Sequence, residues 1–283
     1  MLAVLGALGV VVAGVLVSLV ATTAVASDHV RSNSIGLLVS VWSDASAART
    51  ALTELPRFDA SGTNPDFAGS RRTADQYASQ LAADRTTIQA DDARLHADRD
   101  LLVRQASGMM ALPFRPGLDQ ERMRVDGMRS ALHAADTALQ VEVDQMRTLS
   151  MIFDVEDGFD TLVVDHVQKQ DVAGALALLP GLADKLRAAA QAVAGPSTAP
   201  QARKLVGDLQ TLSTDLETLL QAARHLDLIT VLTLQPKVQA DGAVVEAFDS
   251  DGLESYERTL LQPYVDRFDS GVRAAGFVPR TIT

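Results

Sequence analysis

The sequence contains no cysteine among its 283 residues. Disulfide bonds, thiolate metal ligands and cysteine nucleophiles are therefore excluded. Aromatic residues make up only 4% of the chain, whereas alanine and leucine are abundant. This balance suits closely packed helices better than a β-sandwich, so the composition favours an all-α protein.

Recognisable catalytic motifs are also missing. The chain has no His-Glu-x-x-His zinc motif, no Gly-x-Ser-x-Gly nucleophile turn, no Walker-type phosphate loop and no glycine-rich dinucleotide motif. We therefore expect that the protein is not an enzyme and needs no cofactor.

Charge is absent from the first part of the chain. Met1–Ala26 has no charged side chain, and about 20 apolar residues are enough to cross a bilayer as a helix. The small residues Ala24 and Ala26 match what signal peptidase recognises, but the apolar run is longer than a usual signal core. The sequence predicts that residues 1–27 form a transmembrane anchor, with a cleaved signal peptide as the alternative. Residues 28–283 are expected outside the cytoplasm, either anchored or secreted after cleavage.

The body that follows carries all 36 acidic and 25 basic residues, which gives a net charge of −11. Such a surface repels nucleic acid and anionic lipid headgroups, so we expect no nucleic-acid partner. About 255 residues are enough for one large domain or two compact ones, and a subdivision near residues 155–200 stays open.

Apolar residues recur every seven positions in four segments, 81–102, 118–153, 172–193 and 201–226. This spacing keeps one stripe of a helix against its neighbour along the whole length. The series at 81–102 has charged residues or alanine between its members, which predicts a narrower seam at an edge. The fold expected is all-α: an N-terminal transmembrane helix followed by an elongated antiparallel helical bundle with coiled-coil-like heptad seams.

Proline and glycine predict where the helices end. The helices expected cover about residues 30–55, 71–105, 118–153, 159–194, 200–226 and 253–275. Gly158 is expected to interrupt the fourth of them, and Pro180 is expected to kink it or break it briefly. A serine or threonine just before Pro200 is expected to cap the fifth. Residues 228–250 are expected to be a helix end and a loop.

Three polar residues on one helix face form the candidate metal site. Asp92, His96 and Asp100 are spaced four apart, so a helix brings them to the same side, where they can offer oxygen and nitrogen ligands to a divalent cation. The segment is rich in aspartate and arginine. Ordinary ion pairs on a solvated face are therefore the favoured explanation, and a metal site is the weaker hypothesis.

An apolar loop between two long helices is the candidate partner contact. It contains Met109, Met110 and Phe114, and exposed methionines adapt readily to varied partners. The favoured alternative is that these side chains fold back to close the end of the bundle.

Glu142 occupies a core position of the heptad series at 118–153, and Glu156 lies near the same stripe. A buried carboxylate needs a basic partner or a raised pKa. Seam positions toward an edge also tolerate glutamate, and we favour that explanation over a functional site.

These features together predict a non-catalytic, membrane-anchored, extracytoplasmic helical protein of the cell envelope. It would act through protein–protein contact as a scaffold, adaptor or assembly subunit, with another protein or a second copy of itself as partner. The alternative is a sensor-like bundle that binds a small ligand or a metal. A pocket lined by convergent polar groups would favour this alternative.

Overall fold

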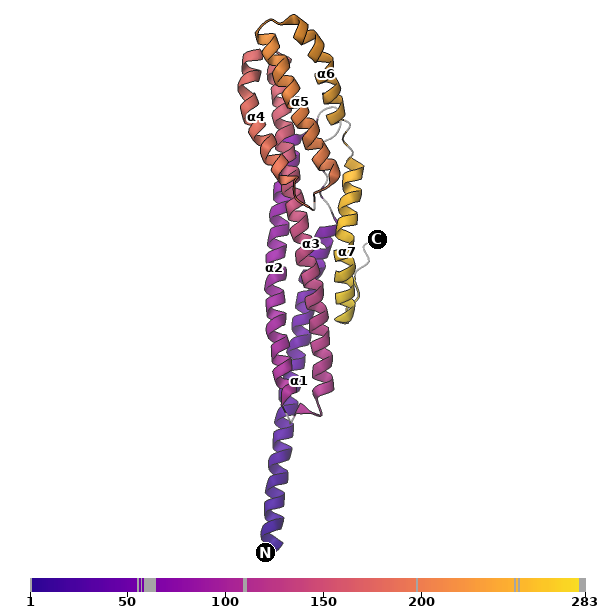
Figure 1. Cartoon of the computed structure of the whole chain (residues 1–283). Helices are drawn as coiled ribbons and strands as arrows, with labels where there is room; N and C mark the ends of the chain where they lie inside the picture. The colour runs from indigo at the N-terminus through magenta and orange to yellow at the C-terminus, as the bar shows by residue number, and fades with distance from the viewer. Residues whose placement is uncertain are drawn as a thin grey trace. The chain divides into compact units, whose positions relative to one another are not determined.

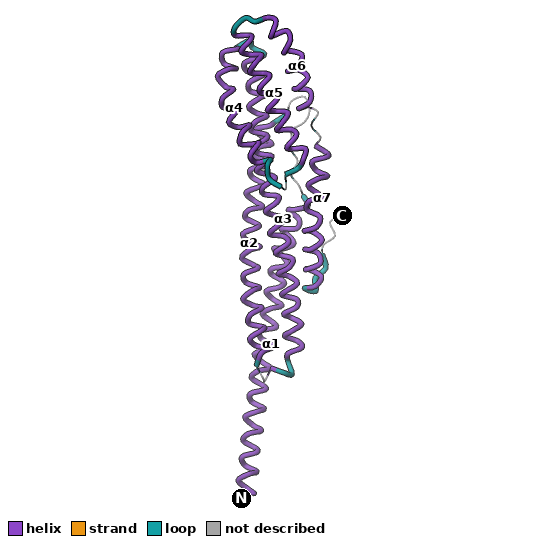
Figure 2. The backbone as a smooth tube through the Cα atoms, in the orientation of Figure 1, coloured by secondary structure: helices purple, strands orange, loops and turns teal. Residues whose placement is uncertain are grey.

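The computed structural model describes residues 2–279 apart from 55, 57, 59–64, 109–110, 197, 247 and 249, and it leaves undescribed the side chains of 2–17, 250, 251 and 254. Every regular element among the described residues is a helix, and none of these residues lies in a strand (Figure 2). The predicted all-α fold is therefore confirmed.

Most of the helices are long (Figure 1). They are α1 (Leu2–Thr53), α2 (Phe67–Ser107), α3 (Arg115–Leu162), the π-helical turn η2 (Val163–Val167), α4 (Val172–Ala192), α5 (Pro200–Arg224), α6 (Leu228–Glu246) and α7 (Ser250–Ala274). The chain divides into two compact units. Unit 1 consists of Met1–Thr53, Ala83–Leu139 and Pro263–Thr283, and unit 2 consists of Glu54–Ala82 and Gln140–Gln262.

The backbone of α1 runs without a break to Thr53, so the helix expected at 30–55 is continuous with the N-terminal segment. Among the residues whose side chains are described, which in α1 begin at Ser18, no helix is long and apolar enough to span a membrane. The predicted transmembrane helix therefore has no support from this part of the structure.

The core of unit 1 is built from four helical segments, belonging to α1, α2, α3 and α7. Its largest buried side chains are Leu38, Ile88, Leu95, Leu102, Leu118, Met128, Leu132 and Leu139. Two contacts attach the C-terminal segment to α1: Arg49 Nε donates to Asp269 Oδ1 at 2.9 Å, and the rings of Trp42 and Phe277 stack with centroids 5.5 Å apart.

The prediction that the heptad seam at residues 81–102 lies at an edge of the bundle is wrong. Ile88 and Leu95 are almost completely buried, and the charged residues Asp91 and Asp98 of the same helix are buried as well. The interior tolerates Asp98 because Ser34 Oγ of α1 donates to its Oδ2 at 2.6 Å. Burial nevertheless raises the pKa of the Asp98 carboxyl, and the hydrogen bond from Ser34 only partly offsets this effect.

The core of unit 2 joins α3, α4 and α5, and α5 also packs against α6. It contains Ile152, Val155, Phe159, Leu162, Leu179, Leu182, Leu186, Leu205, Val206, Leu209, Leu216 and Leu220. Partly buried side chains of α6 and α7, such as Val238 and Leu253, cover this cluster.

The predicted interruption at Gly158 is wrong, because α3 continues to Leu162. The cost of glycine in a helix, about 1 kcal/mol relative to alanine, is smaller than the gain from burying Phe159 and Leu162 beyond it. The chain turns instead between η2 and α4. There Asp171 caps α4 by accepting a hydrogen bond from the backbone N–H of Gly174.

The short break considered at Pro180 does not occur. It lies inside a single helix that runs from Val172 to Ala192. Proline removes one backbone hydrogen bond, but the buried Leu179 and Leu182 fix the helix to the core on both sides of it.

Residues 228–250 were expected to be a helix end and a loop, and this prediction is wrong, because α6 occupies most of them. The β-branched run at its start disfavours a helix only weakly. Packing on α5 decides the structure, and Lys237 Nζ of α6 supports it by pairing with Asp215 Oδ2 of α5 at 2.8 Å.

Two glycines allow α3 and α7 to approach closely in unit 1. A Cβ atom added to Gly271 would lie 2.6 Å from the carbonyl oxygen of Gly127 and 2.7 Å from the backbone nitrogen of Ala131. Both neighbours are backbone atoms, so they cannot move aside as the end of a side chain can.

We predict that Gly271→Ala lowers the free energy of unfolding by about 1–3 kcal/mol through overpacking. The matched control is Gly36→Ala in α1, where an added Cβ meets nothing within 4 Å. That change should raise stability by roughly 0.5–1 kcal/mol, since alanine favours the helix. Urea unfolding followed by circular dichroism measures both. Equal effects of the two substitutions would show that the close approach does not depend on glycine.

Candidate functional site

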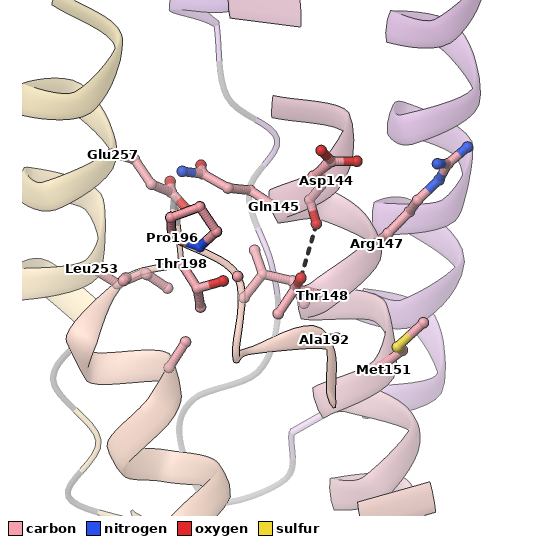
Figure 3. A pocket seen from close by; sticks show the side chains of 14 residues that line it. Asp144, Gln145, Arg147, Thr148, Met151, Ala192, Pro196, Thr198, Leu253 and Glu257 are labelled. Carbon is pink, nitrogen blue, oxygen red and sulfur yellow. Dashed lines mark hydrogen bonds between the residues drawn. The ribbon is translucent and has the colours of Figure 1, made fainter. Parts of the chain in front are cut away.

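Unit 2 contains a cavity of about 320 Å³ between α3, the turn from α4 to α5, the start of α5 and α7 (Figure 3). At about 30 Å³ per molecule this volume would hold roughly ten waters, and it falls at the lower end of small-molecule pockets. The polar side chains that line it are Asp144, Gln145, Arg147, Thr148, Thr198 and Glu257. The remaining lining residues are apolar or glycine.

Arg203 holds the turn that forms one wall of the cavity. Its Nε donates to the carbonyl oxygen of Val193 at 3.0 Å, and its Nη2 donates to that of Gly195 at 2.6 Å.

The prediction that a serine or threonine caps α5 is wrong, because the N-cap of α5 is Ala199 and no side chain caps it. Pro200 explains why the cap is dispensable, since proline has no backbone N–H to satisfy at the first helical position.

Gln145 extends from α3 toward Glu257 on α7 (Figure 3). Its side chain is only 8% exposed, yet neither its Oε1 nor its Nε2 has a hydrogen-bond partner among the described residues. A buried polar group without a partner costs about 1–3 kcal/mol. Gln145 therefore places two unused hydrogen-bonding atoms at the cavity.

Glu142 lies one helical turn before Gln145 and is 0% exposed. Both of its carboxyl oxygens also lack partners among the described residues. Burial raises the pKa of Glu142 to about 8, and the charge of Glu257, which is itself 5% exposed, adds to this effect. The heptad pattern predicted correctly that Glu142 occupies a core position. The favoured explanation, that Glu142 lies toward the edge of the seam, is wrong, because the residue is completely buried.

Glu156 behaves differently. Its surroundings raise its pKa to about 8 as well, but its side chain is only half-buried and it does not line the cavity. Glu142 and Gln145 are therefore buried polar side chains without partners among the described residues. Together with Glu257, which interacts with Glu142 electrostatically, we call them the carboxyl–amide cluster.

The predicted metal ligands lie in unit 1 and do not converge. Asp92 turns toward α3, where Arg129 Nε lies 2.9 Å from its Oδ1 and His133 Nε2 lies 3.4 Å from its Oδ2. His96 Nε2 is 3.8 Å from Asp100 Oδ2. In the described part of the chain no group of three or more such side chains is placed to hold a metal ion.

The predicted contact loop is only partly described. Met109 and Met110 lie outside the described residues. Phe114 is half-buried in the turn before α3, where its backbone N–H donates to the carbonyl oxygen of Ala111 at 2.8 Å. The docking role of this loop stays a prediction.

The sequence alone does not single out Gln145 or Glu257. A signal for Glu257 was present, because it precedes the buried residues Leu261 and Phe268 by four and eleven positions and so shares their face of α7. For Gln145 the signal was its place three residues after Glu142 on α3. Neither signal could show that the two helices meet there.

Comparisons of this chain with protein-family models, with curated proteins and with solved structures find no match. No relative therefore suggests a ligand or a reaction. The chemistry of the cavity has to be read from its own side chains.

We predict that Glu142→Gln makes the protein less sensitive to pH. A folded-state pKa of about 8, against an ordinary value of 4.5, means that the native state holds a proton that the unfolded chain releases. Stability from this group is complete below pH 4.5 and is lost as the pH rises toward 8. The variant should therefore match the parent near pH 4 and be more stable by on the order of 4 kcal/mol at pH 8.

Urea unfolding at pH 4, 6 and 8 tests this prediction. The control is Glu217→Gln, which removes a carboxylate from an exposed position on α5 and should change little at any pH. If the free energy of unfolding changes with pH in the same way for Glu142→Gln and the parent, Glu142 is not held in its protonated form.

Proposed function

We propose that this chain is a non-catalytic helical binding module that holds a small ligand in the cavity of unit 2. Gln145 is the observation that carries the proposal, because it is more than nine-tenths buried, lines the cavity and has both amide atoms unpartnered among the described residues. A ligand that bonds to this amide would remove the cost of burying it. The cavity also combines apolar walls with a few polar groups, as ligand sites do.

Contact with another protein is the second candidate function. Exposed apolar side chains surround the turn from α5 to α6, where Leu226 is 81% and Ile229 is 80% exposed, and Leu228 and Leu232 are also exposed. Apolar groups gathered in this way favour an interaction surface. A bundle that binds a ligand and contacts a partner would act as a sensor or an adaptor.

We further propose that residues 1–27 attach the protein to a membrane and that the acidic body lies outside the cytoplasm. The support is the absence of charge from Met1–Ala26, a run long enough to cross a bilayer, and the small residues Ala24 and Ala26, which match what signal peptidase recognises. Cleavage after Ala26 is the alternative.

The membrane proposal predicts that the full chain stays in the membrane pellet after alkaline carbonate extraction. Val11→Arg should shift it to the soluble fraction, since arginine at the centre of a spanning helix costs about 2.5–3.5 kcal/mol. Mass spectrometry of the mature protein distinguishes cleavage from anchoring. Release of the unaltered, uncleaved chain by carbonate would contradict the anchor.

The ligand proposal predicts that small fragments bind in the cavity. Ligand-observed NMR with a set of cationic, neutral and anionic fragments should find hits that Ala192→Leu abolishes, because the larger side chain fills space beside the turn from α4 to α5. Gly207→Ala is the control, since an added Cβ there meets nothing within 4 Å. If no hit responds to Ala192→Leu while the variant keeps its helical circular dichroism, the cavity is not a ligand site.

A further inference from the structure

Gln145 is the member of the carboxyl–amide cluster that is open to a ligand in the cavity. Glu142 does not line the cavity, and Glu257 lines it but has a partner of its own. Gln145 lines the cavity (Figure 3), is 8% exposed and has both amide atoms unpartnered among the described residues. The hydrogen-bonding pattern of this one amide therefore selects the group that binds beside it.

The amide of Gln145 presents two different atoms side by side in one plane. Its Oε1 accepts hydrogen bonds, and its Nε2 donates them. A half-turn of the amide exchanges the two positions but still leaves one acceptor beside one donor group. The complementary group on a ligand therefore also carries a donor beside an acceptor, as a carboxamide or a lactam does.

Charged groups satisfy only half of this pattern. A carboxylate offers acceptors alone, so its oxygens would leave Oε1 of Gln145 without a donor. An ammonium or amidinium group offers donors alone and leaves Nε2 without an acceptor. Water that fills the cavity would bond to both atoms, and a ligand that displaces it without reproducing both hydrogen bonds loses affinity. A neutral amide reproduces both.

The walls of the cavity indicate the rest of the ligand. They include the apolar side chains of Leu149, Met151 and Leu253 around a volume of about 320 Å³. A compact apolar ring attached to the amide would bury its surface against these side chains.

We propose that the cavity of unit 2 recognises a small neutral molecule through an amide group. The N–H of this group donates to Gln145 Oε1, its carbonyl oxygen accepts from Gln145 Nε2, and its apolar body lies against the walls. This inference rests on the proposed ligand-binding function and adds the chemical class of the ligand.

Four probes of nearly equal shape test the proposal on the full chain. Benzamide carries a donor beside an acceptor, acetophenone and benzoate carry acceptors alone, and benzamidinium carries donors alone. Isothermal titration calorimetry near neutral pH measures their affinities. We expect benzamide to bind about tenfold more tightly than acetophenone, which is also neutral but lacks the N–H donor, and more tightly than either ion.

Variants of Gln145 assign the preference to its side chain. Gln145→Leu should lower the affinity for benzamide by about tenfold, to that of acetophenone, and leave the affinity for acetophenone nearly unchanged. Gln145→Met, which is closer in shape to glutamine, should do the same and decides the question if Gln145→Leu does not fold. Gln210→Leu makes the same substitution at an exposed position of α5 outside the cavity and should change neither affinity.

The other outcomes overturn the inference in different ways. Equal or tighter binding of acetophenone, benzoate or benzamidinium would refute the amide class and leave the cavity as a ligand site. A preference for benzamide that survives both Gln145→Leu and Gln145→Met would refute recognition by this side chain. Binding of none of the four probes would also refute the inference. The fragment hits that Ala192→Leu abolishes, or their absence, then decide separately whether the proposed function stands.

Discussion

The helices that form the two cores each have to bury a stripe of their surface, and this constraint determines which residues the interior can hold. An apolar residue every seven positions meets the constraint in the simplest way, as Leu118, Val125, Leu132 and Leu139 do on α3. A polar residue in the stripe must find a partner inside the bundle or remain costly. The structure contains both cases.

Asp98 and Glu142 show the two cases. In unit 1, Ser34 donates a short hydrogen bond to Asp98, so the carboxyl is buried and partnered. In unit 2, neither oxygen of Glu142 has a partner among the described residues, and the nearby Glu257 adds repulsion. Packing alone explains Asp98, because its partner is built into the neighbouring helix. Packing does not explain Glu142, since a leucine there would give a more stable seam.

Much of the fold could be predicted from the sequence, because the seven-residue pattern directly reports the buried face. It located α2, α3 and α5 and placed Glu142 in the interior. The errors lie where local preference and packing disagree. Gly158 and the β-branched start of α6 disfavour a helix by about 1 kcal/mol or less per residue, and burial against neighbouring helices exceeds this cost.

The candidate site was less predictable than the fold, for a different physical reason. Gln145 and Glu257 belong to helices that are far apart in the chain, and a heptad pattern gives the inward face of a helix but not the residue opposite it. The wall of the cavity also depends on the hydrogen bonds that Arg203 donates to two backbone carbonyls. Such a contact has no sequence signature, because any arginine near a turn could make it.

Burial determines what Glu142 contributes to unit 2. Its two oxygens are buried without partners among the described residues, and the residue does not line the cavity. A carboxylate in such a place would give up its water without compensation, so the neutral form is favoured and the pKa rises to about 8. Near neutral pH the group therefore adds no charge to the interior, and the heptad seam of α3 can accommodate it there.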